Sequence, residues 1–228
     1  MKVPAIIFSR MGSSRLPGKA LRHIAGEPLI KRVIDRVSKV KNLSTIVVAT
    51  SNSKTDDRLT QYIQSLNIEV FRGATHDVLN RAVSCASYLG VDKFVRINGD
   101  SPLIDPELLE KGIEMWRQPN LDLISNVFPR TYPVGTSVEI IKTDSLKKIL
   151  DLTADSCDRE HVTRFFYRNP EKFRILNFES GRSELRKVRL AVDTEEDLER
   201  IDWLFKEFGG LINFEMAAEK SLLWSRVE

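Results

Sequence analysis

The chain has 228 residues, of which 42% are hydrophobic and 29% charged, and its net charge is +3. This composition is typical of a globular protein, and so small a charge gives no reason to expect nucleic-acid binding. Since no apolar run could span a membrane and the N-terminus lacks a signal-peptide pattern, we expect a cytoplasmic protein that binds neither membrane nor nucleic acid. Cys85 and Cys157 show no paired spacing, which favours reduced, incidental thiols.

Strands and helices are expected to alternate along the chain. Apolar runs predict strands at residues 3–8, 45–50, 68–71, 93–97, 121–127, 138–141, 173–178 and 188–192. Apolar residues at helical spacing predict helices at residues 28–40, 55–66, 77–89, 106–117, 143–150, 158–167, 195–208 and 214–224. The regular alternation up to residue 117 predicts an α/β fold with a mostly parallel sheet and helices on both faces, and the later part predicts mixed pairing.

We expect one domain over residues 1–228, in which residues 128–185 are the candidate for an additional lobe over the sheet. The last helix, near residues 214–224, carries apolar residues that either pack on the sheet or contribute to a homodimer interface. The sequence leaves both arrangements open.

The loop after the first expected strand is the most informative segment. Residues 9–19 read SRMGSSRLPGK and contain three cations, two glycines and no acid. Backbone N–H groups and fixed positive charge at the end of a strand suit a polyphosphate. The spacing matches neither a P-loop nor a G-x-G-x-x-G loop, and a basic surface turn is the alternative interpretation.

A second loop is expected to face the first. In a 3-2-1-4 strand order, the loops after strands one and four are neighbours. The fourth expected strand is followed by Gly99, which permits a tight turn, and by Asp100, a candidate Mg²⁺ ligand or an ordinary turn aspartate. Asp193 follows the expected strand at residues 188–192 and is the second candidate ligand. For the residues after Asp193, capping of the next helix is the simpler interpretation.

Three further segments carry charged or rigid residues. Asp77 and Arg81 begin a helix, where they form either an internal salt bridge or a contact to a nucleotide. Glu160 and His161 lie in the segment DREHVT, residues 158–163, which is either a solvated turn or a contact to a polar substrate. The three histidines show no metal-ligand spacing, so a zinc site is not expected.

The segment at residues 132–139, YPVGTSVE, is a stiff turn that enters a strand. It is either a hairpin connection or one wall of a pocket for a sugar-like ligand. In the second case Tyr132 and Glu139, together with Glu160 and His161, are the candidate acceptor contacts.

Taken in order, these motifs resemble the cytidylyltransferase family, which contains the CMP-3-deoxy-manno-octulosonate and CMP-acylneuraminate synthetases and a spore-coat-polysaccharide type. The resemblance rests on RMGSSRLPGK at residues 10–19, GDSPLI at 99–104, REHVT at 159–163 and VDTEEDL at 192–198. It implies a Rossmann-like nucleotide-diphospho-sugar transferase fold. It also implies transfer of CMP from CTP to a sugar, sugar acid or related acceptor, with release of pyrophosphate, for surface polysaccharide or glycan biosynthesis.

The resemblance also assigns roles to residues. It implies that Arg10, Arg15 and Lys19 bind the triphosphate. Backbone or hydroxyl contacts to CTP are implied for Ser9, Gly12 and Ser13, and Mg²⁺ coordination for Asp100 and Asp193. Asn98 stands where the sugar-acid synthetases often carry glutamine, which leaves the acceptor open.

The implied chemistry needs no covalent nucleophile, because Arg15, Lys19 and Asp100 would act by positioning and electrostatics. Two other classes of protein are alternatives. A nucleotide-sugar-dependent glycosyltransferase usually carries a D-x-D motif, which Asp100-Ser101-Pro102 does not complete. A non-catalytic nucleotide-binding protein would keep the basic loop but release no pyrophosphate.

Overall fold

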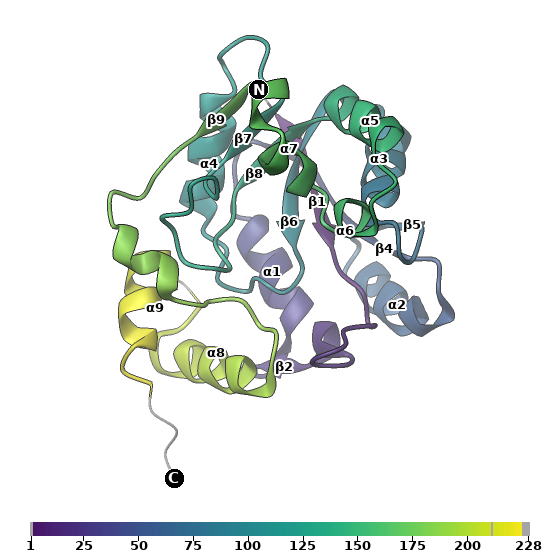
Figure 1. The fold of residues 1–228 in the computed structure, drawn as a ribbon. Coiled ribbons are helices and arrows are strands. Elements are labelled where there is room, and N and C mark those ends of the chain that lie inside the picture. Colours follow the sequence, from purple (N-terminus) through teal and green to yellow (C-terminus); the bar gives the residue numbers. More distant parts are fainter. Residues whose placement is uncertain (1, 211, 225–228) are drawn as a thin grey trace.

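One mixed β-sheet forms the centre of the molecule (Figure 1). Within residues 2–210 and 212–224, which the computed structural model describes, its strands lie in the order β5 (Glu69–Gly73), β4 (Leu43–Ser51), β1 (Val3–Phe8), β6 (Lys93–Asn98), β8 (Glu139–Lys142), β7 (Leu123–Ser125) and β9 (Ile175–Asn177). The first four run parallel, whereas β8 is antiparallel to both β6 and β7. The predicted 3-2-1-4 order and the predicted mixed second half are confirmed.

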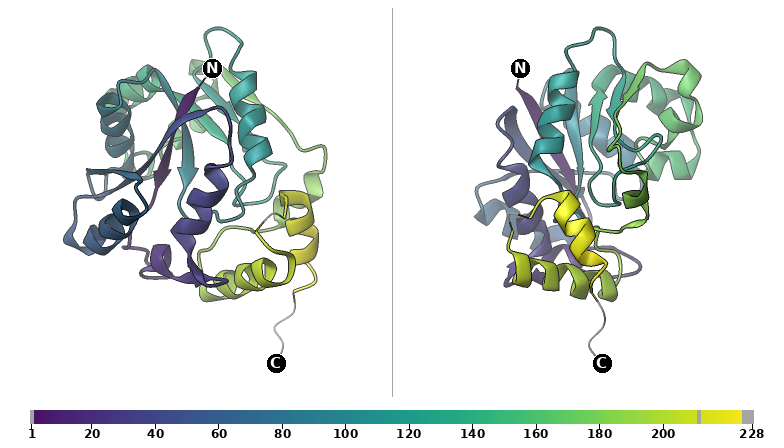
Figure 2. Two further views of the ribbon diagram at one scale, coloured as in Figure 1. Left: turned by 180° about the vertical axis from the view of Figure 1, so that it is seen from behind. Right: turned by 90° about the vertical axis from the view of Figure 1, so that its left-hand side faces the viewer.

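Helices cover both faces of the sheet, as predicted (Figure 2). The core on one face includes residues of α1 (Leu29–Val37), α2 (Asp57–Ser65), α4 (Pro106–Met115), α8 (Glu195–Phe208) and α9 (Phe214–Ser221). The core on the other face includes residues of α3 (Val78–Tyr88), α5 (Thr143–Leu152) and α7 (Arg164–Arg168). Strand β1 is buried along its whole length between these layers, which explains its uninterrupted apolar sequence.

The 128–185 segment contributes β8 and β9 to the central sheet, and its helices α5, α6 (Ser156–Glu160) and α7 follow one another along the chain. Its assignment as an additional lobe of a single domain stays a prediction. A short hairpin of β2 (His23–Ile24) and β3 (Glu27–Pro28) was not predicted. Each helix in the described part of the chain is too short or too polar to cross a lipid bilayer. The homodimer stays a prediction.

Two predicted elements are wrong. Residues 188–192 form no strand of the sheet and make a single bridge, between Val134 and Arg189. The segment instead packs against Gly135, whose φ is +104°, and an added Cβ there would lie 2.6 Å from Ala191 N. Only glycine permits so close an approach in this conformation.

The single helix predicted at residues 158–167 is instead two short helices, α6 and α7, with a break at His161. The break places Val162, fully buried, in the core beneath α3 and α5. Val162 and Thr163 are β-branched and weak helix formers, so tertiary packing overrides the helical pattern here.

Candidate functional site

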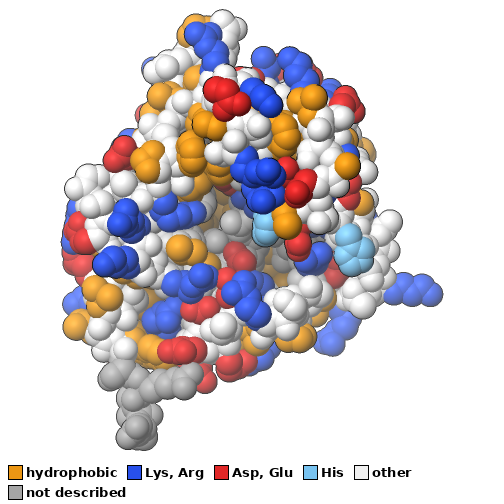
Figure 3. Space-filling view, viewed as in Figure 1, with side chains coloured by type: hydrophobic (Ala, Val, Ile, Leu, Met, Phe, Trp, Pro, Cys, Tyr) orange, Lys and Arg blue, Asp and Glu red, His pale blue; other side chains and the backbone are white. Residues whose placement is uncertain are grey.

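A cavity of about 480 Å³ opens at the carboxyl ends of β1 and β6. The space-filling view shows a hollow on this face, with acidic, basic and histidine side chains around it (Figure 3). Most of the predicted site residues line this cavity: Ser9, Arg10, Gly12, Ser13, Arg15, Lys19, Arg81, Asp100, Glu160, His161 and Asp193. The loop after β1 therefore faces the loop after β6, as the strand order predicts.

Gly99 is the point at which these two loops meet. Its N–H donates a 2.9 Å hydrogen bond to the carbonyl of Phe8, at the end of β1. An added Cβ on Gly99 would lie 2.6 Å from Ser9 Cβ and 2.8 Å from Phe8 O. The absence of a side chain at Gly99 thus sets the spacing between the basic loop and Asp100.

Asp56 anchors the start of the basic loop, and sequence reasoning missed it. This buried carboxylate accepts hydrogen bonds from Met11 N at 2.7 Å, Thr50 Oγ1 at 2.9 Å, and Ser51 N at 3.0 Å. Burial alone would raise the pKa of Asp56, but the hydrogen bonds from Ser51, Met11 and Thr50 lower it below its ordinary value. In the sequence Asp56 resembles any acid in the first turn of a helix.

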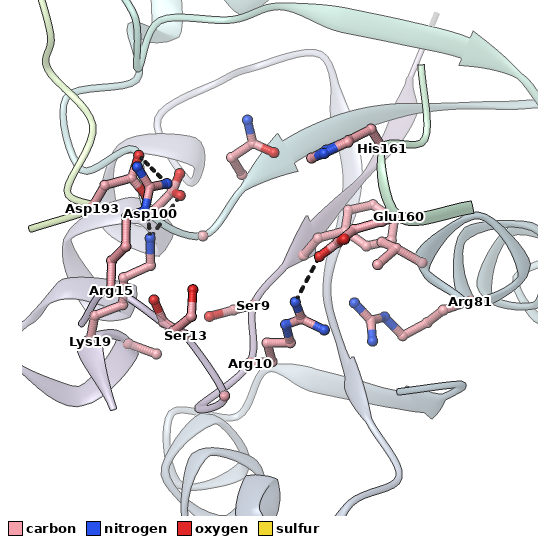
Figure 4. A pocket seen from close by; sticks show the side chains of 17 residues that line it. Ser9, Arg10, Ser13, Arg15, Lys19, Arg81, Asp100, Glu160, His161 and Asp193 are labelled. Carbon is pink, nitrogen blue, oxygen red and sulfur yellow. Dashed lines mark hydrogen bonds and ion pairs between the residues drawn. The ribbon is translucent and has the colours of Figure 1, made fainter. Parts of the chain in front are cut away.

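Asp100 and Asp193 converge on one point, which Lys19 occupies (Figure 4). The Lys19 ammonium lies 3.0 Å from Asp100 Oδ2, 2.9 Å from Asp193 Oδ1 and 2.7 Å from the Val192 carbonyl. Arg15 and Arg189 pair with the other oxygen of Asp193, at 3.1 and 2.8 Å. Burial would raise the pKa of Asp193, but the hydrogen bond and charge of Lys19, with Arg15 and Arg189, lower it.

The side chain of Asp193 does not cap the helix that follows it. Thr194, not Asp193, caps α8, and it forms a capping box with Asp197. Capping therefore explains the residues after Asp193, as expected, and leaves Asp193 directed at the cavity. Two carboxylates that already converge on a cation suit a hard divalent ion, whose remaining ligands would be phosphate oxygens and water.

A second set of charged residues, Arg10, Arg81 and Glu160, lies on the other side of the cavity (Figure 4). Arg10 donates hydrogen bonds of 3.1 Å to the carbonyl of Thr75 and to Glu160. Arg81 is buried and donates to the carbonyl of Ala74, while its Nε has no partner in the described structure. Burial, followed by the charge of Arg10, lowers the pKa of Arg81 to about 10.

A smaller cavity of about 360 Å³ adjoins the first and shares Asn98 and His161 with it. Four arginines line it: Arg96, Arg130, Arg164 and Arg168. The predicted acceptor contacts His161 and Glu139 both belong to this lining. Sequence reasoning missed the arginines, because they are spread over β6, the 126–138 loop and α7.

Glu139 organises one side of the second cavity. It is buried, forms an ion pair with Arg96 and accepts a 2.6 Å hydrogen bond from Tyr167. Burial would raise the pKa of Glu139, but Arg96, Tyr167 and Thr163 lower it below its ordinary value. Burial and the charge of Glu139 raise the pKa of Tyr167, so Tyr167 stays a neutral donor.

Two predicted site residues lie outside both cavities. Asp77 caps α3 through the N–H of Asn80 and pairs with Arg159 at 3.0 Å, not with Arg81. Tyr132 is buried against Phe178 and Phe214, and its hydroxyl donates to the carbonyl of Glu179. The contacts of Asp77 and Tyr132 with these partners give both side chains a structural role.

The chain is similar to several known proteins in sequence and in fold. The chain is 32% identical over 210 residues to the spore coat polysaccharide biosynthesis protein SpsF of Bacillus subtilis, covering 90% of this chain and 86% of that protein. A cytidylyltransferase structure from Leptospira borgpetersenii has a TM-score of 0.88 and 29% identity, over 98% of this chain and 93% of its own. A CMP:2-keto-3-deoxy-manno-octonic acid synthetase complexed with CTP shares the fold, with a TM-score of 0.73 and 20% identity over 91% of this chain and 99% of its own. A family model described as cytidylyltransferase matches residues 4–225, and the chain therefore belongs to the cytidylyltransferase family.

Proposed function

We propose that this protein transfers CMP from CTP to an anionic, sugar-type acceptor and releases pyrophosphate. The observation that carries the proposal is the pair of adjoining cavities, which share Asn98 and His161. The larger one has the cations for a triphosphate, and the smaller one has arginines for an acidic acceptor. Two substrates held there would have their reacting groups close to the shared wall.

In the proposed reaction, an oxygen of the acceptor attacks the α-phosphorus of CTP. A new P–O bond forms, the bond between the α-phosphorus and the bridging oxygen breaks, and pyrophosphate leaves. Arg10, Arg15 and Lys19 offset the negative charge of the triphosphate and of the leaving pyrophosphate. Ser9, Gly12 and Ser13 lie in the same loop and supply polar contacts to it, while Arg81 adds a buried cation.

We propose Mg²⁺ as the cofactor, held by Asp100 and Asp193. When bound, the ion supplies Lewis-acid stabilisation of the phosphate oxygens. Within the described residues no group of three or more acidic, cysteine or histidine side chains forms a complete metal site. This agrees with a metal that takes its other ligands from the nucleotide and from water.

The acceptor is proposed to be anionic because arginine dominates the second cavity. Asp158 is buried and pairs with both Arg164 and Arg168, which fixes their guanidinium groups on α7. Arg130 has no carboxylate within ion-pair distance in the described structure, and its guanidinium donates to Pro133 O and Ser137 Oγ. An acidic acceptor would supply the missing counter-charge.

Pyrophosphate release is the direct test. The four nucleoside triphosphates would be screened with Mg²⁺ against sugar acids, aminosugars, sugar phosphates and phosphonates. Release that needs CTP and one acidic acceptor supports the proposal. Tight CTP binding with no release for any acceptor would favour a non-catalytic nucleotide-binding protein, and release with neutral acceptors alone would contradict the anionic class.

A further inference from the structure

Lys19 occupies the place where the two metal-binding carboxylates converge. An ammonium group has three N–H donors, and the three contacts of Lys19 use all of them, on Asp100, Asp193 and Val192. The Lys19 side chain is only 14% exposed. In this structure Lys19 therefore serves as the cation between the two carboxylates, and all three of its donors are engaged there.

Neighbouring cations already more than balance the negative charge of the two carboxylates. Asp193 Oδ1 faces Lys19, and its Oδ2 faces both Arg15 and Arg189. Asp100 Oδ2 faces Lys19 as well. Three cations thus surround two carboxylates, so a divalent ion arriving alone would have to displace an ammonium and enter a region of net positive charge.

A nucleotide changes this balance. Its triphosphate brings several negative charges into the cavity and offers Lys19, Arg15 and Arg10 new oxygen partners. Release of Lys19 from the carboxylates onto a phosphate would free the two oxygens that it now bridges, Asp100 Oδ2 and Asp193 Oδ1. The divalent ion can then bind to carboxylate and phosphate oxygens together.

We propose that Lys19 makes binding of the divalent ion depend on the nucleotide: it holds Asp100 and Asp193 in position while the cavity lacks nucleotide, and gives them up only when a triphosphate arrives. The metal then enters with CTP and not before it. This inference rests on the proposed function for the identity of nucleotide and metal. In this role Lys19 is a positioning residue for the carboxylates as well as a phosphate ligand.

The test is binding of Mn²⁺, followed by the electron paramagnetic resonance signal of the free ion, on the full chain. The nucleotide is a CTP analogue with a methylene group between the α- and β-phosphates, so that no turnover occurs. For the unmodified protein we expect no measurable binding of Mn²⁺ alone at millimolar concentration. With the analogue we expect a loss of free Mn²⁺ signal clearly beyond that caused by the same concentration of analogue without protein. Equal binding of Mn²⁺ with and without the analogue would overturn the proposal.

The variant Lys19→Met removes the charge and keeps the length of the side chain. It should bind Mn²⁺ without nucleotide at least about tenfold more tightly than the unmodified protein, since a positive charge next to both carboxylates is gone. The double variant Lys19→Met with Asp100→Asn should lose this gain. An affinity of Lys19→Met for Mn²⁺ alone no higher than that of the unmodified protein would contradict the proposal.

The matched control is Lys31→Met, because Lys31 forms a similar Lys–Asp pair with Asp35, remote from the cavity. It should leave Mn²⁺ binding unchanged. Thermal unfolding of each variant checks that the fold is intact, and Lys19→Gln replaces Lys19→Met if the latter does not fold. None of these measurements needs turnover, so failure of the proposed reaction, seen as absent pyrophosphate release, is distinguishable from failure of this inference.

Discussion

The backbone N–H of Val192 donates a 2.9 Å hydrogen bond to the carbonyl of Asp100. This bond fixes the segment before Asp193 beside the loop after β6, although the two are far apart in the sequence. The side chains of Asp100 and Asp193 then meet at Lys19. A backbone contact outside the sheet thus assembles the proposed metal site.

The first prediction concerns these two carboxylates. Asp100→Asn and Asp193→Asn should each lower kcat/KM for pyrophosphate release by at least about 100-fold, because metal coordination supplies several kcal/mol of transition-state stabilisation. Asp57→Asn is the control, since Asp57 is half-exposed and pairs with Arg72. If Asp193→Asn kept normal turnover, Asp193 would have no role in the reaction.

The second prediction concerns the contact between the two loops. Gly99→Ala should destabilise the protein by about 1–3 kcal/mol, because its Cβ would overlap Ser9 and the Phe8 carbonyl. It should also weaken CTP binding, since either loop must move. Urea unfolding and calorimetric titration with CTP measure the two effects.

Gly12→Ala serves as the control for stability in this experiment. An added Cβ on Gly12 meets nothing within 4 Å, so its unfolding free energy should change by less than about 0.5 kcal/mol. If Gly99→Ala were equally harmless, the close approach of β1 and β6 would not set the geometry of the cavity.

The meeting of the basic loop with the loop after β6 could be predicted from the sequence. The loop after β1 and the loop after β6 follow long apolar strands, and parallel strands bring their carboxyl ends to one edge. Arg10, Lys19 and Asp100 were therefore expected to lie together, and the structure brings them to one cavity. Asp193 was predicted to follow a strand that the structure does not form, and tertiary contacts of the 188–192 segment bring it to the cavity all the same.

The second cavity could not be predicted in the same way. Its arginines come from β6, a loop and α7, and no local pattern links Arg96, Arg130 and Arg164. The break between α6 and α7 depends on burial of Val162, which helical periodicity does not reveal. Asp56 was missed because its role consists of long-range hydrogen bonds.

The third prediction concerns Asp56 and pH. Asp56→Ala would leave the buried donors Thr50 Oγ1 and Ser51 N, and the part-buried Met11 N, without their acceptor. The expected cost is about 2–3 kcal/mol in the free energy of unfolding. Because folding lowers the pKa of Asp56, its contribution is complete above the unfolded pKa of about 3.9 and is lost as pH falls through the lower folded value.

Urea unfolding of the unmodified protein and of Asp56→Asn over a pH series checks this sign. The difference in unfolding free energy should be constant above about pH 5 and should shrink as the pH falls below about 4. A difference that grows towards acid pH would contradict the assignment. Asp57→Asn again provides the control, because the neighbouring Asp57 is half-exposed and pairs with Arg72.

The fourth prediction separates Tyr132 from the acceptor. Tyr132→Phe removes only the hydrogen bond from its hydroxyl to the Glu179 carbonyl, so stability should fall by about 1 kcal/mol. The KM for the acceptor should not change, since the ring is packed between Phe178 and Phe214. A raised acceptor KM with unchanged stability would restore Tyr132 as an acceptor contact.

The fifth prediction concerns Arg130, the arginine of the second cavity without a carboxylate partner in the described structure. Arg130→Gln should raise the KM for the acidic acceptor found in the screen by about 10- to 100-fold, because a charge-assisted hydrogen bond is lost. The KM for CTP should stay within about twofold of its original value. Arg182→Gln is the control, because Arg182 pairs with Glu184 and Glu219 on the surface. An equal rise in both KM values would mean that Arg130 supports the cavity wall and does not select the acceptor.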